Sequence, residues 1–141
     1  MQGRRLVIDA NILIRAVLGV RVRELIERYC ESAAFYVAES NLDEAVQYLS
    51  ELAPRRGIGE QVWQESLAGI MAAVQIIPQA ELAPAETEAK ARIGKRDEDD
   101  WPAVAGALQF DCPVWTEDED FFGSGVATWT TATVELYLRP D

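Results

Sequence analysis

Short apolar runs alternate with longer stretches of helical periodicity along the chain. The runs predict strands at residues 6–8, 34–38, 76–77, 113–116 and 126–129. Apolar residues spaced three or four positions apart predict helices at residues 11–19, 22–29, 41–53, 58–74, 81–92 and 101–110, before a closing segment at 134–138. Strands that alternate with helices are typical of parallel βαβ units. The pattern therefore predicts an α/β protein with a parallel sheet.

Polar residues and prolines mark the expected ends of these helices. Asn11 is expected to cap the first helix, and Asn41 is expected to open the third, which should stop before Pro54. The third helix has an apolar stripe made of Leu42, Ala45, Val46 and Leu49. The helix at 58–74 is expected to turn Val62, Leu67, Ile70 and Val74 inward. Segment 81–92 predicts a mostly exposed helix, whereas the alanine-rich segment 101–110 predicts a helix packed closely on the sheet.

Composition narrows the class of protein. A chain of 141 residues with 49% hydrophobic content predicts a single domain spanning residues 1–141 with its own core. Because no apolar stretch is long enough for a membrane span or a signal peptide, we expect a cytoplasmic protein with no membrane partner. The chain has no histidine, which excludes Ser-His and Cys-His nucleophile pairs. Carboxylates remain as the catalytic groups.

Aspartates follow two of the predicted strands directly. Asp9 ends the first strand, and Asp118 and Asp120 follow the strand at 113–116. Because the carboxyl ends of parallel strands meet at one edge of a sheet, these carboxylates are expected to converge there. Clustered carboxylates repel one another unless a cation neutralises them, and sets of oxygen ligands favour Mg²⁺ or Mn²⁺. The sequence thus predicts a metal site at this edge.

Four motifs together resemble one known family. They are IDANIL with Asp9, NLDEAVQYL with Glu44, DWPAVAGAL with Asp100, and WTEDEDF with Thr116, Asp118 and Asp120. In this order the motifs are similar to those of the PIN domains, metal-dependent ribonucleases that include the VapC-type toxins of bacterial toxin–antitoxin pairs. The C-terminal stretch is particularly similar to stand-alone bacterial PIN proteins. The resemblance implies a three-layer αβα sandwich with a central, mostly parallel sheet.

The resemblance also implies roles for individual residues. Asp9, Glu44, Asp100 and Asp118 would be the catalytic and metal-binding acids, with Asp120 assisting directly or through water. Asn11 and Thr116 would position water or orient the carboxylates. One or two Mg²⁺ or Mn²⁺ ions would then serve to produce hydroxide from water and stabilise the phosphate under attack.

Several alternatives stay open at the level of sequence. Asp43 competes with Glu44 for the second acid position, because Asn41 and Glu44 also have capping-box spacing. Asp97 and Asp99 are explained as helix-entry charges, and Asp118 and Asp120 could both be caps. Two other acid-rich α/β classes fit less well. Haloacid-dehalogenase-type phosphatases need an aspartate where Asn11 stands, and response-regulator receivers need a late lysine, although no lysine follows Lys95.

The resulting functional hypothesis is a Mg²⁺- or Mn²⁺-dependent endoribonuclease acting on single-stranded RNA, with the toxin of a toxin–antitoxin pair as its biological form. A net charge of −11 disfavours binding of RNA by a broadly basic surface. Hence the alternative hypothesis is a catalytically weak PIN-like binding module for a basic, antitoxin-like protein partner. The sequence leaves open whether the protein is a homodimer.

Overall fold

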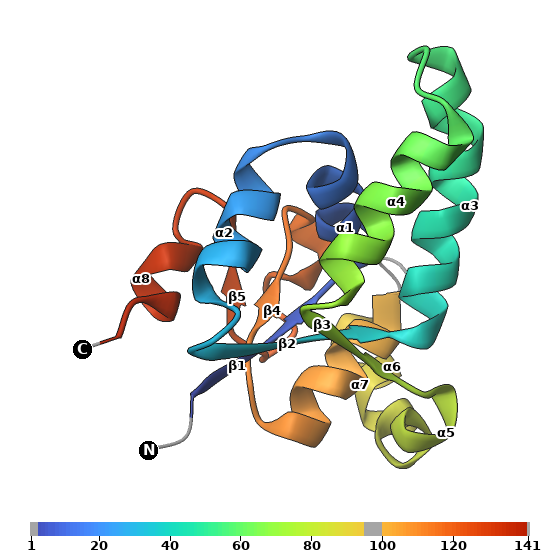
Figure 1. The fold of residues 1–141 in the computed structure, drawn as a ribbon. Coiled ribbons are helices and arrows are strands. Elements are labelled where there is room, and N and C mark those ends of the chain that lie inside the picture. The colour runs from blue at the N-terminus through green and yellow to red at the C-terminus, as the bar shows by residue number, and fades with distance from the viewer. Residues whose placement is uncertain (1–2, 95–99, 141) are drawn as a thin grey trace.

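The computed structural model describes residues 3–94 and 100–140 and has a parallel five-stranded sheet at its centre (Figure 1). In order along the chain, the strands are β1 (Arg4–Ile8), β2 (Ala33–Ala38), β3 (Val74–Ile77), β4 (Val114–Trp115) and β5 (Thr128–Trp129). Their order in the sheet is β3-β2-β1-β4-β5. The chain first adds β2 and β3 on one side of β1 and then adds β4 and β5 on the other side. The carboxyl ends of β1 and β4 therefore border a topological switch point, where α/β sheets place their ligands.

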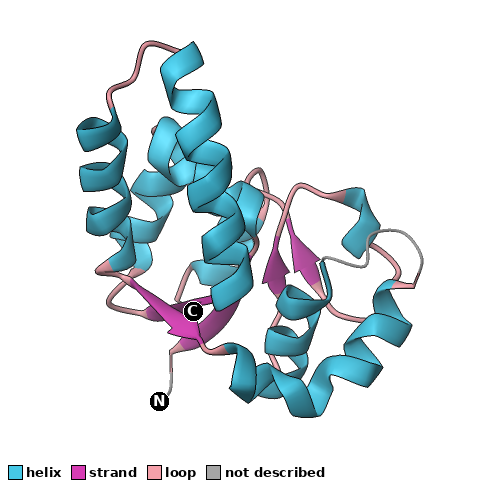
Figure 2. Cartoon of the chain, turned by 90° about the vertical axis from the view of Figure 1, so that its right-hand side faces the viewer, coloured by secondary structure: helices cyan, strands magenta, loops and turns pink. Residues whose placement is uncertain are grey.

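Helices cover both faces of this sheet (Figures 1 and 2). One face carries α1 (Ala10–Leu18), α2 (Arg21–Tyr29), α3 (Glu39–Arg55), α4 (Glu60–Met71) and α8 (Val134–Leu138). The other face carries α5 (Gln79–Leu82), α6 (Glu86–Ile93), α7 (Trp101–Phe110) and two 3₁₀ helices, η1 (Ala83–Ala85) and η3 (Glu119–Phe121). These layers confirm the predicted αβα sandwich, and the described strands are all parallel.

The central strand shows why the sheet needs both helical layers. Leu6, Val7 and Ile8 are all fully buried. Leu6 and Ile8 belong to the core under α1–α4, whereas Val7 belongs to the core under α5–α7. Alternate residues of a strand point to opposite faces, so an uninterrupted apolar run is stable only when both faces are covered.

Helix α7 packs very closely on the sheet, as its composition predicts. A Cβ atom at Gly106 would lie 3.0 Å from Ile77 Cδ1 and 3.5 Å from Val7 Cγ2. The alanines beside this glycine are buried as well. Small residues therefore let the helix axis approach the sheet and bring Asp100, immediately before α7, toward the strand ends.

Two predicted helix starts were wrong. Helix α1 begins at Ala10 with Asp9 as its cap, and α3 begins at Glu39, so Asn11 and Asn41 both lie inside helices. In each case the strand runs straight into the helix without a connecting turn. The cap position therefore falls on the last extended residue, Asp9 or Ala38.

Three predictions about α3 and α4 also need correction. Helix α3 includes Pro54 in its last turn and ends one residue later. Its buried residues are Asn41, Ala45, Leu49 and Ala53, so the stripe is narrow and Val46 lies outside it, 37% exposed. Val62, in the first turn of α4, is 63% exposed because the distal ends of α3 and α4 project beyond the sheet (Figure 1).

Two further segments differ in their boundaries. The expected helix at 58–74 ends at Met71, and Val74 begins β3 instead. The expected helix at 81–92 is three short elements with Pro84 in the middle one, and it buries Leu82 and Ala89. The predicted helix-entry charges at 97 and 99 lie outside the described residues.

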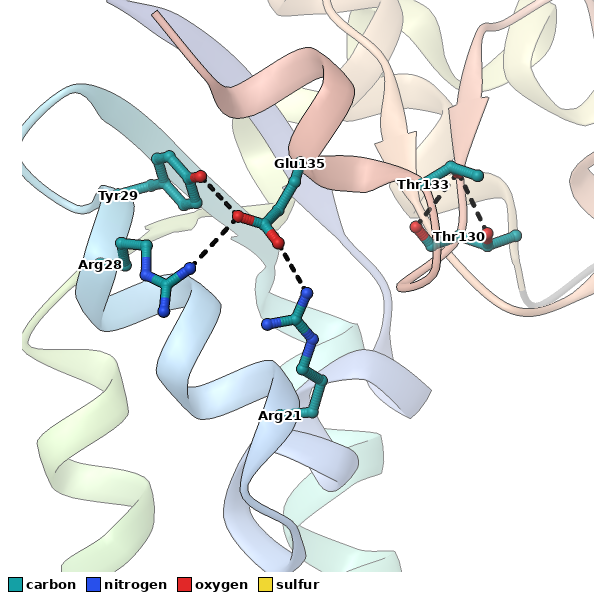
Figure 3. A network of polar contacts seen from close by, with 6 residues as sticks. All are labelled: Arg21, Arg28, Tyr29, Thr130, Thr133 and Glu135. Carbon is teal, nitrogen blue, oxygen red and sulfur yellow. Dashed lines mark hydrogen bonds and ion pairs between the residues drawn. The ribbon is translucent and has the colours of Figure 1, made fainter.

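A carboxylate on α8 attaches the C-terminal helix to α2 (Figure 3). The Tyr29 hydroxyl donates to Glu135 Oε2 over 2.6 Å, Arg21 Nη2 donates to Glu135 Oε1 over 2.6 Å, and Arg28 Nη1 donates to Oε2 over 3.3 Å. The hydrogen bond from Tyr29 and the adjacent Arg21 lower the pKa of Glu135 to about 2. The network holds α8, which follows β5, against α2.

Among the helices of residues 3–94 and 100–140, none combines the length and the apolar character that crossing a membrane requires.

Candidate functional site

The carboxyl ends of β1 and β4 place Asp9 and Thr116 side by side. Ile8 is paired with Trp115, and the Asp9 amide donates to the Trp115 carbonyl over 3.3 Å. The next residue on each strand is therefore at the same level of the sheet edge. Across this edge the Thr116 hydroxyl donates a hydrogen bond to Asp9 Oδ2. Both side chains are buried, Thr116 completely.

Asp9 has a second, structural role at the start of α1. Its Oδ1 atom accepts the Ile12 amide hydrogen over 2.9 Å, which makes Asp9 the cap of the helix. Both carboxylate oxygens thus accept one hydrogen bond each. Each ionised carboxylate oxygen has two lone pairs, so a further ligand position on each oxygen remains.

The environment of Asp9 opposes its ionisation. Burial raises the pKa of Asp9 to about 6, although the hydrogen bonds from Thr116 and Ile12 act in the opposite direction. The negative charges of Asp118 and Glu44 raise this pKa further. Asp9 is therefore electrostatically coupled to two other acids that the sequence singles out. A cation placed among them would favour the ionised form of all three.

A chain of hydrogen bonds extends from Asp9 into the loop after β4. The Thr116 hydroxyl oxygen accepts the Asp118 amide hydrogen over 2.9 Å, and Asp118 Oδ1 accepts the Asp120 amide hydrogen over 2.9 Å. Asp118 caps η3 in this way. Thr116 consequently links the carboxylate of Asp9, which follows β1, to the loop that carries Asp118 and Asp120.

Three carboxylates converge beside this chain of hydrogen bonds. Asp100, Asp118 and Asp120 each contribute an oxygen, and these oxygens all lie within 4.8 Å of one another. All three side chains are partly buried. The geometry places Asp120 in the same group as Asp118, so it does not decide which of the two would bind metal directly.

The structure places Glu44 and Asn11 at the margin of the site. Glu44 is exposed on α3 and lines a small cavity with Gln79 and Trp101. Its charge reaches Asp9, as the pKa of Asp9 shows, but Glu44 is outside the close carboxylate group. Asn11 is exposed on α1. It lines a groove that is also lined by Asp118.

Several residues near the site were not predicted from the sequence. Arg15, Tyr48 and Arg56 line the same groove as Asn11 and Asp118. Arg15 could have been predicted from its spacing, because it is four residues after Asn11 and so lies on the same face of the helix. Asn41, expected as a cap, is instead buried, and within the described part of the chain its Oδ1 atom has no hydrogen-bond partner.

Known structures with this fold come from several organisms, and 28 chains match significantly. The crystal structure of VapBC2 from Rickettsia felis, bound to a DNA fragment from its promoter, has a TM-score of 0.71 at 12% identity and covers 89% of this chain and 98% of that one. PAE2754 from Pyrobaculum aerophilum has a TM-score of 0.70 at 16% identity, with 96% and 95% covered. A toxin-antitoxin complex from Klebsiella pneumoniae has a TM-score of 0.65 at 15% identity, with 89% and 97% covered.

Comparison with curated proteins gives no significant match. The family model described as PIN domain, however, matches residues 7–139, which begin inside β1 and include every later element through α8. Together with the parallel sheet and the carboxylates at its switch point, this match shows that the chain belongs to the PIN domain family.

Proposed function

We propose that this protein is a Mg²⁺- or Mn²⁺-dependent endoribonuclease that hydrolyses single-stranded RNA. The observation that supports it most directly is the group formed by Asp100, Asp118 and Asp120 beside the buried Asp9. Nuclease activity is typical of the PIN domain family, to which the chain belongs. The solved toxin-antitoxin complex with this fold supports the toxin of such a pair as the biological form.

The donor set fits a hard divalent cation. The three converging groups are carboxylates, and neither histidine nor a cysteine is among them. The three oxygens lie within 4.8 Å of one another, so these three side chains are the residues that would hold one shared ion.

The residues of the chain have distinct tasks in this proposal. Asp100 and Asp118 would hold the ion directly, with Asp120 assisting directly or through water and with Asp9 and Glu44 completing the negative field around it. Thr116 holds the Asp9 carboxylate and the Asp118 amide through one hydroxyl group, so it ties the carboxylate that follows β1 to the backbone of the loop that follows β4. When bound, the cation supplies an activated water and stabilises negative charge on the phosphate.

The reaction that follows is attack of water on the phosphorus atom. The bond from phosphorus to the 3′ oxygen of the preceding nucleotide breaks, leaving a 5′-phosphate and a 3′-hydroxyl. Because water is the nucleophile, the ribose 2′-hydroxyl is not consumed and no cyclic phosphate forms.

The test is cleavage of single-stranded RNA by the purified protein with Mg²⁺, with Mn²⁺ and with excess EDTA. We expect cleavage with either metal, none in EDTA, and 5′-phosphate product ends. Asp118→Asn should lose the activity, whereas Glu119→Gln, an exposed neighbour in the same loop, serves as the matched control and should keep it.

Cutting that persists in EDTA, or products that end in cyclic phosphate, would contradict the proposal. If folded protein bound a basic partner protein but left RNA intact with both metals, the catalytically weak binding module would replace it. The net charge of −11 is the observation that favours this second candidate.

A further inference from the structure

A groove of about 840 Å³ leads away from the carboxylates along α1 and α3. We call it the arginine groove, because Arg15, Arg21 and Arg56 line it, together with Tyr48. Asp118 lines the same groove, so the groove is continuous with the candidate site. Its volume is within the range of about 300–1,000 Å³ that is usual for ligand sites.

One part of the groove has a local charge opposite to that of the protein as a whole. The chain has a net charge of −11, yet three arginines lie in this one depression, and the acidic residues of its lining, Glu117 and Asp118, are adjacent residues at the end next to the candidate site. Arg21 is neutralised by Glu135 over 2.6 Å. Neither Arg15 nor Arg56 takes part in an ion pair within the described ranges, and both side chains are exposed.

These unpaired cations indicate an anionic occupant. A basic protein segment, which the overall charge would attract, would meet repulsion from Arg15 and Arg56 in the groove itself. A polyanion would be repelled by most of the surface but attracted here. Around Arg15 and Arg56, local charge therefore favours nucleic acid over a basic peptide.

The apolar part of the groove indicates that the nucleic acid is single-stranded. Ile14, Leu18 and Leu52 also line the groove, and Tyr48 is 49% exposed. A single strand presents base faces as well as phosphates, and bases stack on aromatic side chains. In a duplex the base faces are stacked on one another and cannot use this surface.

We propose that the arginine groove binds a single-stranded RNA on the path to the carboxylates, with Arg15 and Arg56 each contacting a phosphate and Tyr48 stacking on a base. This inference rests on the proposed function and adds the substrate-binding surface to it. The three residues are positioning residues, since they lie outside the carboxylate group.

The test measures RNA binding separately from cleavage. The affinity for a fluorescent oligouridylate is measured by anisotropy with Mg²⁺ present, with a gel to confirm intact RNA, and again in EDTA. Each phosphate contact to a single strand contributes about 0.7 to the slope of log affinity against log salt. Raising the salt concentration from about 50 to 200 mM therefore weakens binding about 2.6-fold for each phosphate contact. A variant that lacks one contact should be weakened about 2.6-fold less than the wild type by the same increase.

We expect Arg15→Gln and Arg56→Gln each to lower the slope by about 0.7, and the double variant by about 1.4. Arg55→Gln is the matched control, because Arg55 is in the last turn of the same helix as Tyr48 but does not line the groove. It should leave the slope unchanged. Tyr48→Leu should weaken binding by roughly 5- to 150-fold, and Tyr48→Phe should restore it.

Equal slopes for the wild type and the Arg15 and Arg56 variants would overturn the inference, as would an Arg55→Gln variant with an equally reduced slope. So would groove variants that bind RNA normally but lose a protein partner, because the groove would then hold a polypeptide. Wild-type protein that binds RNA through the groove but never cleaves it would instead contradict the proposed function alone. Melting curves of each variant confirm that these exposed substitutions leave the fold intact.

Discussion

Replacing Asp9 by asparagine should stabilise the metal-free protein, even though Asp9 caps a helix. The amide is close in shape to the carboxylate, and its oxygen can accept the Ile12 amide hydrogen as Asp9 Oδ1 does. Its NH₂ group can donate to the Thr116 hydroxyl oxygen, reversing the direction of that hydrogen bond. What the substitution removes is a buried negative charge that burial and the nearby acids Asp118 and Glu44 disfavour.

The size of the effect follows from the pKa of Asp9, which is about 6 in the folded protein against an ordinary value of 3.8. Because the folded value is the higher one, the folded state binds more protons between these pH values, and stability falls as pH rises through them. One pKa unit corresponds to about 1.4 kcal/mol. The ionised Asp9 therefore destabilises the folded state by roughly 2 kcal/mol at about pH 5 and roughly 3 kcal/mol at about pH 8.

The assay is urea unfolding of wild type and Asp9→Asn in EDTA at several pH values between about 5 and 8, above the isoelectric point of about 4.4. The free energy of unfolding of the variant should exceed that of the wild type, and the excess should increase with pH. Asp43→Asn, which changes an exposed acid on α3, is the control and should show no such trend. A variant that is less stable than wild type at about pH 8, or an excess independent of pH, would refute the reasoning.

Four other predictions concern the site and the fold. Mn²⁺ at 100 times its dissociation constant should stabilise the protein by about 2.7 kcal/mol in thermal unfolding, and an unchanged melting temperature would argue against a metal site. In calorimetric titrations Asp118→Asn should nearly abolish Mn²⁺ binding and Asp120→Asn should weaken it by roughly 10- to 100-fold; the opposite order would reverse their ranking. Thr116→Val should lower Mn²⁺ affinity by a similar factor of roughly 10 to 100 without unfolding the protein, because it removes the hydroxyl that joins the Asp9 carboxylate to the backbone of the loop after β4. An unchanged titration would show that other contacts hold these groups in place. Glu135→Gln should lower the melting temperature at neutral pH. Because the pKa of Glu135 is lowered from its ordinary value of 4.5 to about 2, its charge contributes full stability above the ordinary value, and the loss should shrink as pH falls from there to about 2. A loss of the same size at all pH values would mean that the charge is not responsible.

Much of the fold could be predicted from local sequence. The run of Leu6, Val7 and Ile8 predicts a strand buried on both faces, and the alanines around Gly106 predict a helix close to the sheet, because each depends only on the size and polarity of neighbouring residues. Helix boundaries were less predictable. Asn11 and Asn41 have the chemistry of caps, but the strands before them leave no turn, and the cap position is decided by where the strand hydrogen bonds stop.

The candidate acids could also be recognised from their order along the chain, whereas their arrangement is a property of the tertiary structure. Only the pairing of β1 with β4 brings Thr116 to Asp9, and only the packing of α7 brings Asp100 to the oxygens of Asp118 and Asp120. Arg15 and Arg56 appear in the sequence as two of thirteen basic residues in an acidic chain. They line one groove because α1 and α3 pack together over the sheet, and charges that are distant in sequence act jointly only when folding brings them within a few ångströms.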